Sequence, residues 1–272
     1  MDVTFIGTGE AFDTERGNYS CLVENENHSM LVDCGYKSPY SLRGLLKKQG
    51  RSFLEIPESI LFTHFHGDHF DGLPALLIPL WDEVRTLKDS GEKPERRLTI
   101  ASSHTGIKDK VIKRIEESYP GLYDLFEKDG FYIDFREINP ANNLLSTFEI
   151  SSALTAHSVN NYAYKIRGLG QGIARDVAIS GDGALTDASR ALYPGVGLLV
   201  HEGFFVETHS KNHASIKEVV DYAISKGVRD VAIVHVNQDE RKKVREIERI
   251  VGEALEKDVH VIFPSDHEVF RF

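Results

Sequence analysis

Residues 63–72 read Thr63-His64-Phe65-His66-Gly67-Asp68-His69-Phe70-Asp71-Gly72 and directly follow the apolar segment 59–62. The apolar segment predicts a buried strand, and Gly67 allows a tight turn after it. Positions 64, 66, 68 and 69 carry three imidazoles and a carboxylate, which are ligands for zinc-like ions. A surface loop that is rich in histidine by chance is the alternative. Four such side chains within six positions favour a turn that serves two metal ions.

Other short apolar segments predict the strands of two sheets. The predicted strands are 3–9 with a glycine turn at its end, 20–24, 29–35, 59–63, 98–102, 148–154, 162–166, 176–180, 198–200, 231–234 and 259–263. The predicted helices are 41–49, 72–84 with interrupting prolines, 108–117, 215–226 and 240–257, with a charged loop at 89–97. Strands followed by helices in each half predict an α/β fold in which two sheets pack face to face with helices outside. No linker or repeat divides the chain, so we expect one domain over residues 1–272.

The bulk composition limits the possible functions. The chain has 272 residues, 41% of them hydrophobic, and a formal net charge of -10, which argues against a large surface for nucleic acid. No segment has the ~20 apolar residues of a membrane span, and the start lacks the pattern of a signal peptide, so we expect a cytoplasmic protein without a membrane partner. Cys21 and Cys34 lie at predicted strands and are interpreted as packed thiols.

The pattern at residues 64–69 resembles the His-x-His-x-Asp-His signature of the metallo-β-lactamase fold hydrolases. The resemblance extends along nearly the whole chain and implies a four-layer αβ/βα sandwich of two mixed sheets with outer helices. Asp33 matches the family's acidic residue that supports the metal loop. His157, Asp182 and His235 each follow a predicted strand and resemble the remaining ligand segments. Taken singly, they would more often be structural histidines and a turn aspartate, but their order after strands favours the metal interpretation.

The resemblance also implies a division of the ligands between two divalent metal ions. It places His64, His66 and His157 on one ion, places Asp68, His69 and His235 on the other, and makes Asp182 the bridging carboxylate. Zinc is the expected metal, although these ligands also suit manganese and iron. A water between the ions would be acidic enough to be hydroxide near neutral pH, and this hydroxide would attack the substrate, with Asp68 as a catalytic residue.

A second resemblance is to ribonuclease Z. Val200-His201-Glu202-Gly203-Phe204-Phe205 and His213-Ala214-Ser215 are similar to its His-Glu-Ala-Thr-Phe and His-Ser-Thr segments. The resemblance implies that His213 helps to protonate the leaving oxygen and that Glu202 orients it. His213 is alternatively a cap of the helix that begins near Ser215. His201 and His209 are candidates for further pocket residues, but not for metal ligands.

Two departures from ribonuclease Z bear on the substrate. Only 25 positions separate His157 from Asp182, which leaves no room for the arm that grips transfer RNA, and the space is expected to hold a Gly-containing hairpin. Residues 236–239 read Val-Asn-Gln-Asp where ribonuclease Z has a Ser-x-Arg-Tyr pattern that contacts RNA. We therefore expect a phosphodiesterase for a small substrate, plausibly a cyclic nucleotide, similar to the anti-Pycsar type of enzyme that counters cyclic-nucleotide defence signalling.

Several alternatives stay open. The first is a ribonuclease Z-type endonuclease that processes transfer RNA 3′ ends, and the second is a lactonase or other ester hydrolase of the same fold. A third is a binding module without catalysis. The cyclic-nucleotide relatives are homodimers, so a loop over residues 81–97 with Trp81, Arg85, Arg96 and Arg97 is a candidate to reach a partner's pocket, or is simply a charged exposed loop.

Overall fold

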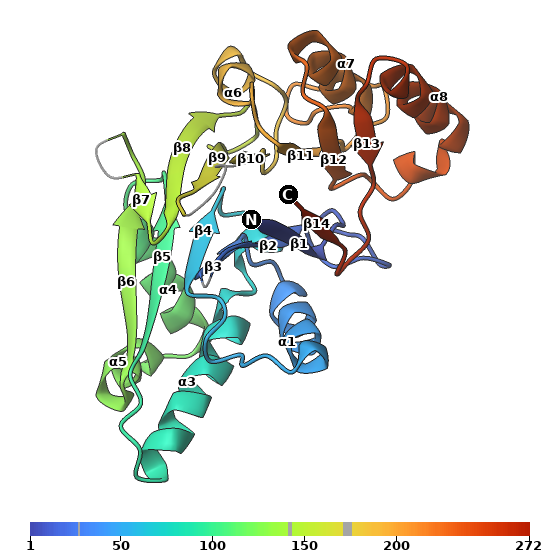
Figure 1. Ribbon diagram of the computed structural model, residues 1–272. Helices are drawn as coiled ribbons and strands as arrows, with labels where there is room; N and C mark the ends of the chain where they lie inside the picture. Colours follow the sequence, from blue (N-terminus) through green and yellow to red (C-terminus); the bar gives the residue numbers. More distant parts are fainter. Residues whose placement is uncertain (27, 141–142, 171–175) are drawn as a thin grey trace.

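The computed structural model describes residues 1–26, 28–140, 143–170 and 176–272, and within them the strands form two seven-stranded sheets (Figure 1). The first sheet has the order β14 (Val269–Arg271), β1 (Asp2–Gly7), β2 (Ser20–Asn25), β3 (His28–Val32), β4 (Ser59–Phe62), β5 (Arg96–Ser102) and β6 (Phe131–Glu137). The second has the order β13 (His260–Ile262), β12 (Asp230–Val234), β11 (Leu198–Glu202), β10 (Asp176–Ile179), β9 (Tyr162–Gly168), β8 (Phe148–Leu154) and β7 (Leu144–Leu145). Both sheets contain parallel and antiparallel pairs.

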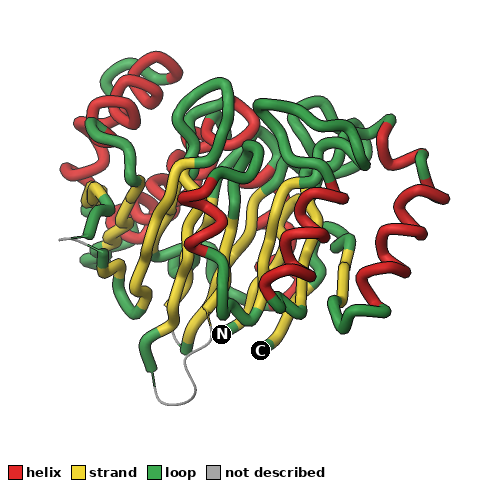
Figure 2. Tube along the Cα trace, turned by 90° about the horizontal axis from the view of Figure 1, so that it is seen from above, coloured by secondary structure: helices red, strands yellow, loops and turns green. Residues whose placement is uncertain are grey.

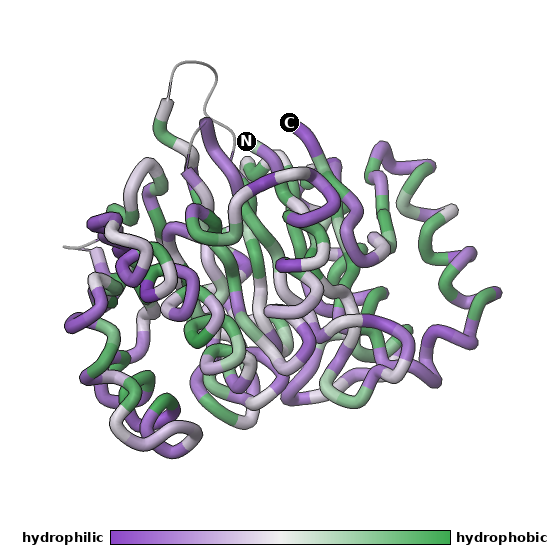
Figure 3. The backbone as a smooth tube through the Cα atoms, turned by 90° about the horizontal axis from the view of Figure 1, so that it is seen from below, coloured by the Kyte–Doolittle hydropathy of each residue, from purple (hydrophilic) through white to green (hydrophobic). Residues whose placement is uncertain are grey.

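The sheets pack face to face, and helices cover their outer faces. The inner faces share one apolar core that includes Phe5, Leu61 and Val200. A second core lies between the first sheet and helices α1 (Ser38–Gln49), α3 (Leu73–Asp89), α4 (Ile107–Ser118) and α5 (Leu122–Asp129). A third lies between the second sheet and α7 (Ile216–Lys226) and α8 (Val244–Leu255). Figure 2 shows the strands in the middle with helices on both sides, and Figure 3 shows that the central strands are mostly hydrophobic. The predicted four-layer α/β sandwich of two mixed sheets with outer helices is confirmed.

Strand direction gathers the polar segments at one edge of the sandwich. Strands β3, β4 and β5 are mutually parallel, as are β10, β11 and β12. The residues that follow their carboxyl ends therefore meet at the same edge, as they do in other open α/β sheets. Asp33 and His64 follow β3 and β4, while Asp182 and His235 follow β10 and β12.

Helix α3 corrects two predictions from the sequence. It runs unbroken over Leu73–Asp89 although Pro79 lies inside it, so Trp81 and Arg85 are helical and not part of a loop. Burial of the leucine-rich face of α3 compensates for the hydrogen bond that Pro79 cannot donate. Trp81 donates to Asp129 at 2.9 Å, and Arg96 begins β5 with Arg97. The structure therefore contradicts a loop over residues 81–97, whereas the reach of this segment to a partner stays a prediction.

Other differences concern short elements. The sequence did not predict α5, β6, β7, β14, the four-residue α2 (Gly67–Phe70) or α6 (Asp187–Leu192). The predicted helix 240–257 is a 3-10 turn, η1 (Glu240–Lys242), followed by α8. Both cysteines are buried free thiols, as predicted. The predicted hairpin before Asp182 includes residues 171–175, which lie outside the described residues. None of the described helices has both the length and the apolar composition that a bilayer crossing requires.

Candidate metal centre

The first cluster of metal-ligating side chains contains His64, His66, His157 and Asp182. Nδ1 of His66 lies 3.2 Å from Nε2 of His64 and 3.1 Å from Nε2 of His157. Asp182 Oδ2 lies 3.9 Å from the same nitrogen of His64 and 3.8 Å from that of His157. Three imidazole nitrogens and a carboxylate oxygen thus face one point, as the ligands of a tetrahedral zinc ion do.

The second cluster contains Asp68, His69, Asp182 and His235. Asp68 Oδ2 lies 3.4 Å from Nε2 of His69 and 3.4 Å from Nε2 of His235. Asp182 Oδ1 lies 3.2 Å from Nε2 of His69 and 3.5 Å from Nε2 of His235. Asp182 therefore turns one oxygen to each cluster, which is the arrangement that a bridging carboxylate requires.

The donor atoms fit a pair of divalent cations. Nε2 of His69 and Oδ1 of Asp182 are buried and have no partner with hydrogen-bond geometry among the described residues, although they lie 3.2 Å apart. A buried polar atom without a partner costs about 1–3 kcal/mol. In the first cluster, Nδ1 of His66 lies 3.1–3.2 Å from Nε2 of His157 and of His64, so neutral rings can direct lone pairs from all three nitrogens to one cation. The cluster is therefore a divalent-metal site.

The protonation of the imidazoles differs between the two clusters. Burial lowers the pKa of His64, His66 and His157, so these rings are neutral and offer a lone pair to a metal. Burial also acts to lower the pKa of His235, but the charge of Asp182 outweighs it and raises this pKa to about 9. Burial acts to raise the pKa of Asp68, but the charge of His69 and hydrogen bonds hold it well below its usual range. The second cluster therefore has ionised carboxylates that attract a cation, which competes with protons for the imidazoles.

Hydrogen bonds behind the ligands fix which nitrogen faces the metal site. Asp33 accepts hydrogen bonds from the backbone N–H of Thr63 at 2.8 Å, from the Thr63 hydroxyl at 2.7 Å and from Nδ1 of His69 at 2.8 Å. The Thr63 hydroxyl lies 3.0 Å from Nδ1 of His64, and the carbonyl of Asn212 accepts from Nδ1 of His157 at 2.9 Å. With Nδ1 engaged, Nε2 of all three rings is free for a metal ion.

Two residues of this network adopt a backbone conformation that L-amino acids seldom occupy. Asp33 has φ 60° and His235 has φ 54°. Such a conformation costs about 1–3 kcal/mol per residue and is typical of functional sites. Strong local contacts hold both residues, including the donors to the Asp33 carboxylate and a 2.9 Å bond from the His235 N–H to the carbonyl of Thr8. Strain at these two positions supports a role in the site.

A third group of side chains lies next to the second cluster. Glu202, His213 and His235 lie close together, and Nδ1 of His213 donates to Glu202 at 3.0 Å. Phe204 stacks on the His213 ring with centroids 4.5 Å apart. Burial acts to lower the pKa of His213, but the hydrogen bond to Glu202 raises it. The helix cap of α7 is Ser215, so His213 is free of the capping role that was its alternative.

The structure places two predicted pocket residues away from the site and adds one that the sequence did not indicate. His201 is buried beside Tyr193, and His209 is exposed and pairs with Glu218, so neither lines the site.

Asn161 is fully buried; its side-chain N–H groups donate to the carbonyls of Ser180 and Asp182, and its oxygen accepts from the Asp182 N–H. Its contacts join segments about 20 residues apart, so no local pattern marks Asn161 as the clamp of the Asp182 turn.

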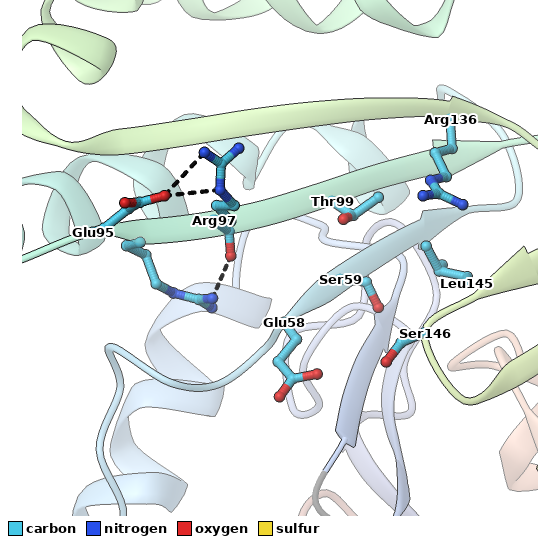
Figure 4. Close-up of a pocket in the computed structure, with 9 residues that line it drawn as sticks. Glu58, Ser59, Glu95, Arg97, Thr99, Arg136, Leu145 and Ser146 are labelled. Atoms are coloured by element: carbon cyan, nitrogen blue, oxygen red, sulfur yellow. Dashed lines mark hydrogen bonds and ion pairs between the residues drawn. The ribbon is translucent and has the colours of Figure 1, made fainter.

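A cavity of about 550 Å³ lies at the opposite end of β4 from the metal cluster. Glu58 and Ser59 line it at the start of this strand, whereas His64 follows the end of the strand (Figure 4). Arg97 in the cavity pairs with Glu95 at 2.9 Å, and both are drawn in contact in Figure 4. None of its lining residues belongs to a metal-ligating cluster, so the cavity is separate from the metal centre.

Comparison with known proteins supports the same assignment. The family model described as anti-Pycsar protein Apyc1 matches residues 1–94. Ribonuclease Z of Lactococcus lactis subsp. cremoris (strain MG1363) is 23% identical over an alignment of 318 residues, which covers 96% of this chain and 95% of that protein. Zinc phosphodiesterase ELAC protein 1 of Mus musculus is 33% identical over 123 residues, which is 45% of this chain and 31% of that protein.

A solved structure has the same fold as this chain. The metallo-β-lactamase fold protein YhfI from Bacillus subtilis superposes with a TM-score of 0.71 at 20% sequence identity, over 99% of this chain and 98% of that one. The resemblance to metallo-β-lactamase fold hydrolases and to ribonuclease Z that the motifs indicate is confirmed.

Proposed function

We propose that this chain, a metal-dependent hydrolase of the metallo-β-lactamase fold, hydrolyses a small phosphodiester, most simply a cyclic nucleotide. The observation that carries the proposal is the position of Asp182 between two clusters, with Glu202 and His213 beside the second. We assign His64, His66 and His157 to one metal ion and Asp68, His69 and His235 to the other, with Asp182 shared. Zinc is the metal that we propose, because imidazole and carboxylate ligands at this geometry suit it.

Two divalent ions, when bound, supply Lewis acidity toward the phosphoryl oxygens and lower the pKa of an attacking water. The chain's own residues orient the imidazoles and supply a proton. Asp33 and Thr63 hold the imidazoles in the orientation that leaves Nε2 free. Glu202 accepts from Nδ1 of His213, so the opposite nitrogen of that ring can give a proton to the departing ribose oxygen.

The length of one segment supports a small substrate. The interval between His157 and Asp182 holds β9, β10 and residues 171–175, so it is too short for the arm of ribonuclease Z. The match of residues 1–94 to the anti-Pycsar model favours a cyclic nucleotide over transfer RNA. The similarity to ribonuclease Z over nearly the whole chain keeps transfer RNA processing as the second candidate.

Turnover on three classes of substrate tests the proposal. We expect the purified protein to hydrolyse 3′,5′-cyclic nucleotides and to lose this activity with a chelator, and to leave precursor transfer RNA and an acyl-homoserine lactone largely intact. Cleavage of transfer RNA alone would support the second candidate. Hydrolysis of the lactone alone would show that the site is an ester hydrolase. Metal binding without turnover on any substrate would indicate a binding module.

The role of His213 gives a specific prediction. His213→Ala should lower kcat for a cyclic nucleotide by about 10²–10⁴-fold, the usual contribution of a positioned general acid, with little change in KM. The loss should be much smaller for bis(p-nitrophenyl) phosphate, because p-nitrophenolate leaves without a proton. Steady-state kinetics with both substrates measure the difference.

Controls for this prediction lie in the same segment. His209→Ala removes an exposed histidine that pairs with Glu218 and should leave turnover nearly unchanged. Glu202→Gln should be milder than His213→Ala, because an amide oxygen still accepts from Nδ1. An equal loss on both substrates would show that His213 does not act as the acid.

Two further predictions concern the oligomeric state and the cellular location of the protein. We propose that the chain is a homodimer, as the resemblance implies, and sedimentation equilibrium measures its mass in solution. We also expect it in the cytoplasm, which fractionation of the source cells tests.

A further inference from the structure

A small cavity lies directly beside the first metal-ligating cluster. Its lining residues are Phe65, His104, Lys110, Val159 and Asn160, and its volume is about 260 Å³. Phe65 stands between His64 and His66 in the sequence, and Val159 and Asn160 follow His157 closely. Nε2 of His104 donates to the carbonyl of Thr63 at 3.2 Å, which ties this wall to the metal loop. A substrate held at the metal centre therefore has this cavity at its side.

The size of the cavity limits what it takes. Sites that enclose a whole drug-sized ligand have roughly 300–1,000 Å³, so this cavity takes only part of a substrate. With the phosphodiester at the metal ligands, the ribose is fused to it, and the base is the part of a cyclic nucleotide that extends away from the metal centre. The cavity and the metal centre are neighbours, as the base and the phosphodiester of one nucleotide must be.

The walls suit a planar heteroaromatic ring. Phe65 and His104 meet edge to face with ring centroids 4.7 Å apart, and Tyr162 supports the far side of His104 at 4.9 Å. Val159 adds an aliphatic surface that is 42% exposed. A site for a second phosphate would instead gather several donors, whereas this cavity has a single cation.

That cation is Lys110 on α4, and its charge is available to a ligand. Its ammonium lies 4.9 Å from the centre of the Phe65 ring. Among the described residues no hydrogen bond or ion pair engages it, in contrast to Lys113 one turn along, which pairs with Glu117 at 3.7 Å. An exposed lysine over the face of an aromatic ring can exchange its contact with the ring for a hydrogen bond to a ligand.

We propose that Phe65, His104, Lys110, Val159 and Asn160 form the nucleobase subsite of this phosphodiesterase, and that Lys110 makes it prefer guanine to cytosine. Guanine offers two adjacent acceptors, O6 and N7, to a lysine ammonium, whereas cytosine offers an amino donor at the corresponding edge. The inference rests on the proposed function, because it assumes that a nucleotide occupies the metal centre.

The test compares two substrates and three variants. Steady-state KM and kcat are measured for 3′,5′-cyclic GMP and 3′,5′-cyclic CMP with the wild-type protein, Lys110→Gln, Lys110→Arg and the control Lys113→Gln, all with full metal content. The wild type should have the lower KM for cyclic GMP. Lys110→Gln should raise that KM about tenfold, the effect of losing one charged hydrogen bond, with kcat unchanged and less than twofold change for cyclic CMP. Lys110→Arg should restore most of the preference, and Lys113→Gln should match the wild type.

The outcomes separate this inference from the proposed function. If the wild type hydrolyses neither cyclic nucleotide, the proposed function fails and the subsite fails with it. If it hydrolyses both without a preference for cyclic GMP, or if Lys110→Gln leaves both KM values unchanged, only the subsite is wrong. An equal rise in KM for both substrates would also overturn it, because Lys110 would then contact the phosphodiester that both share. Bis(p-nitrophenyl) phosphate, which has no base, should show the same KM with all four proteins.

Discussion

Asp68→Ala should lower kcat/KM for a phosphodiester by about 10³-fold or more, at the upper end of what one electrostatic contact to a transition state contributes. Asp68 Oδ2 lies 3.4 Å from a nitrogen of both His69 and His235, so the substitution removes the one carboxylate that belongs to the second cluster alone. Asp68 is 8% exposed, and the turn around it keeps its backbone hydrogen bonds. The fold should therefore remain, with a melting temperature within a few degrees of the wild type.

Asp71→Ala is the matched control for this substitution. Asp71 lies three positions later in the same loop and pairs with Arg114 at 2.8 Å, outside both clusters. We expect it to keep most of the activity, which would separate loss of a metal ligand from damage to the loop. An Asp68→Ala protein that is active and fully metallated would show that the cluster has been misread.

Asp182→Ala should have the largest effect on metal content, because its two oxygens face different clusters. We expect both ions to bind weakly and turnover to fall below detection. The neighbouring histidines keep this carboxylate ionised: burial acts to raise its pKa, but the charges of His235 and His69 hold it well below the usual range. Removing one partner of such a buried pair costs about 3–5 kcal/mol, so the free energy of unfolding should also fall.

Asp182→Asn separates these two effects. It keeps the shape of the side chain and one acceptor, so it should fold better than Asp182→Ala and still lose one or both metal ions. Asp176→Asn is the control at the start of β10, the strand that leads to Asp182, where the Asp176 side chain pairs with Arg167 at 3.0 Å. Elemental analysis of all three proteins measures the metal content. Two ions per chain in Asp182→Ala would contradict a shared carboxylate.

Much of the fold follows from local sequence signals, whereas the assignment of His157, Asp182 and His235 to the candidate site depends on their order after strands and on the resemblance to metallo-β-lactamase fold hydrolases. Strand periodicity predicts most of the strands, and the positions of the ligands after parallel strands explain why side chains as distant as His64 and His235 meet. The signals fail where packing between distant segments decides the outcome. Pro79 suggests a break, but the buried leucines of α3 keep the helix intact.

The supporting residues of the site were the hardest to predict. Asn161 holds the Asp182 turn through hydrogen bonds to Ser180 and Asp182, and Gly181 has φ 59° with no room for a side chain against Asn161. Phe204 stacks on His213 where the segment after β11 lies beside the start of α7, with a bridge between Phe205 and Ser215. Contacts of this kind join residues that are far apart in the sequence, so they leave no periodic or motif-like pattern.

A metal titration tests the central claim most directly. The protein is stripped with a chelator, dialysed and titrated with zinc while hydrolysis of a 3′,5′-cyclic nucleotide is followed. We expect no turnover before zinc is added and a plateau at two equivalents per chain, because two clusters share Asp182. Full activity in the chelated protein, or a plateau at one equivalent, would contradict a two-metal phosphodiesterase.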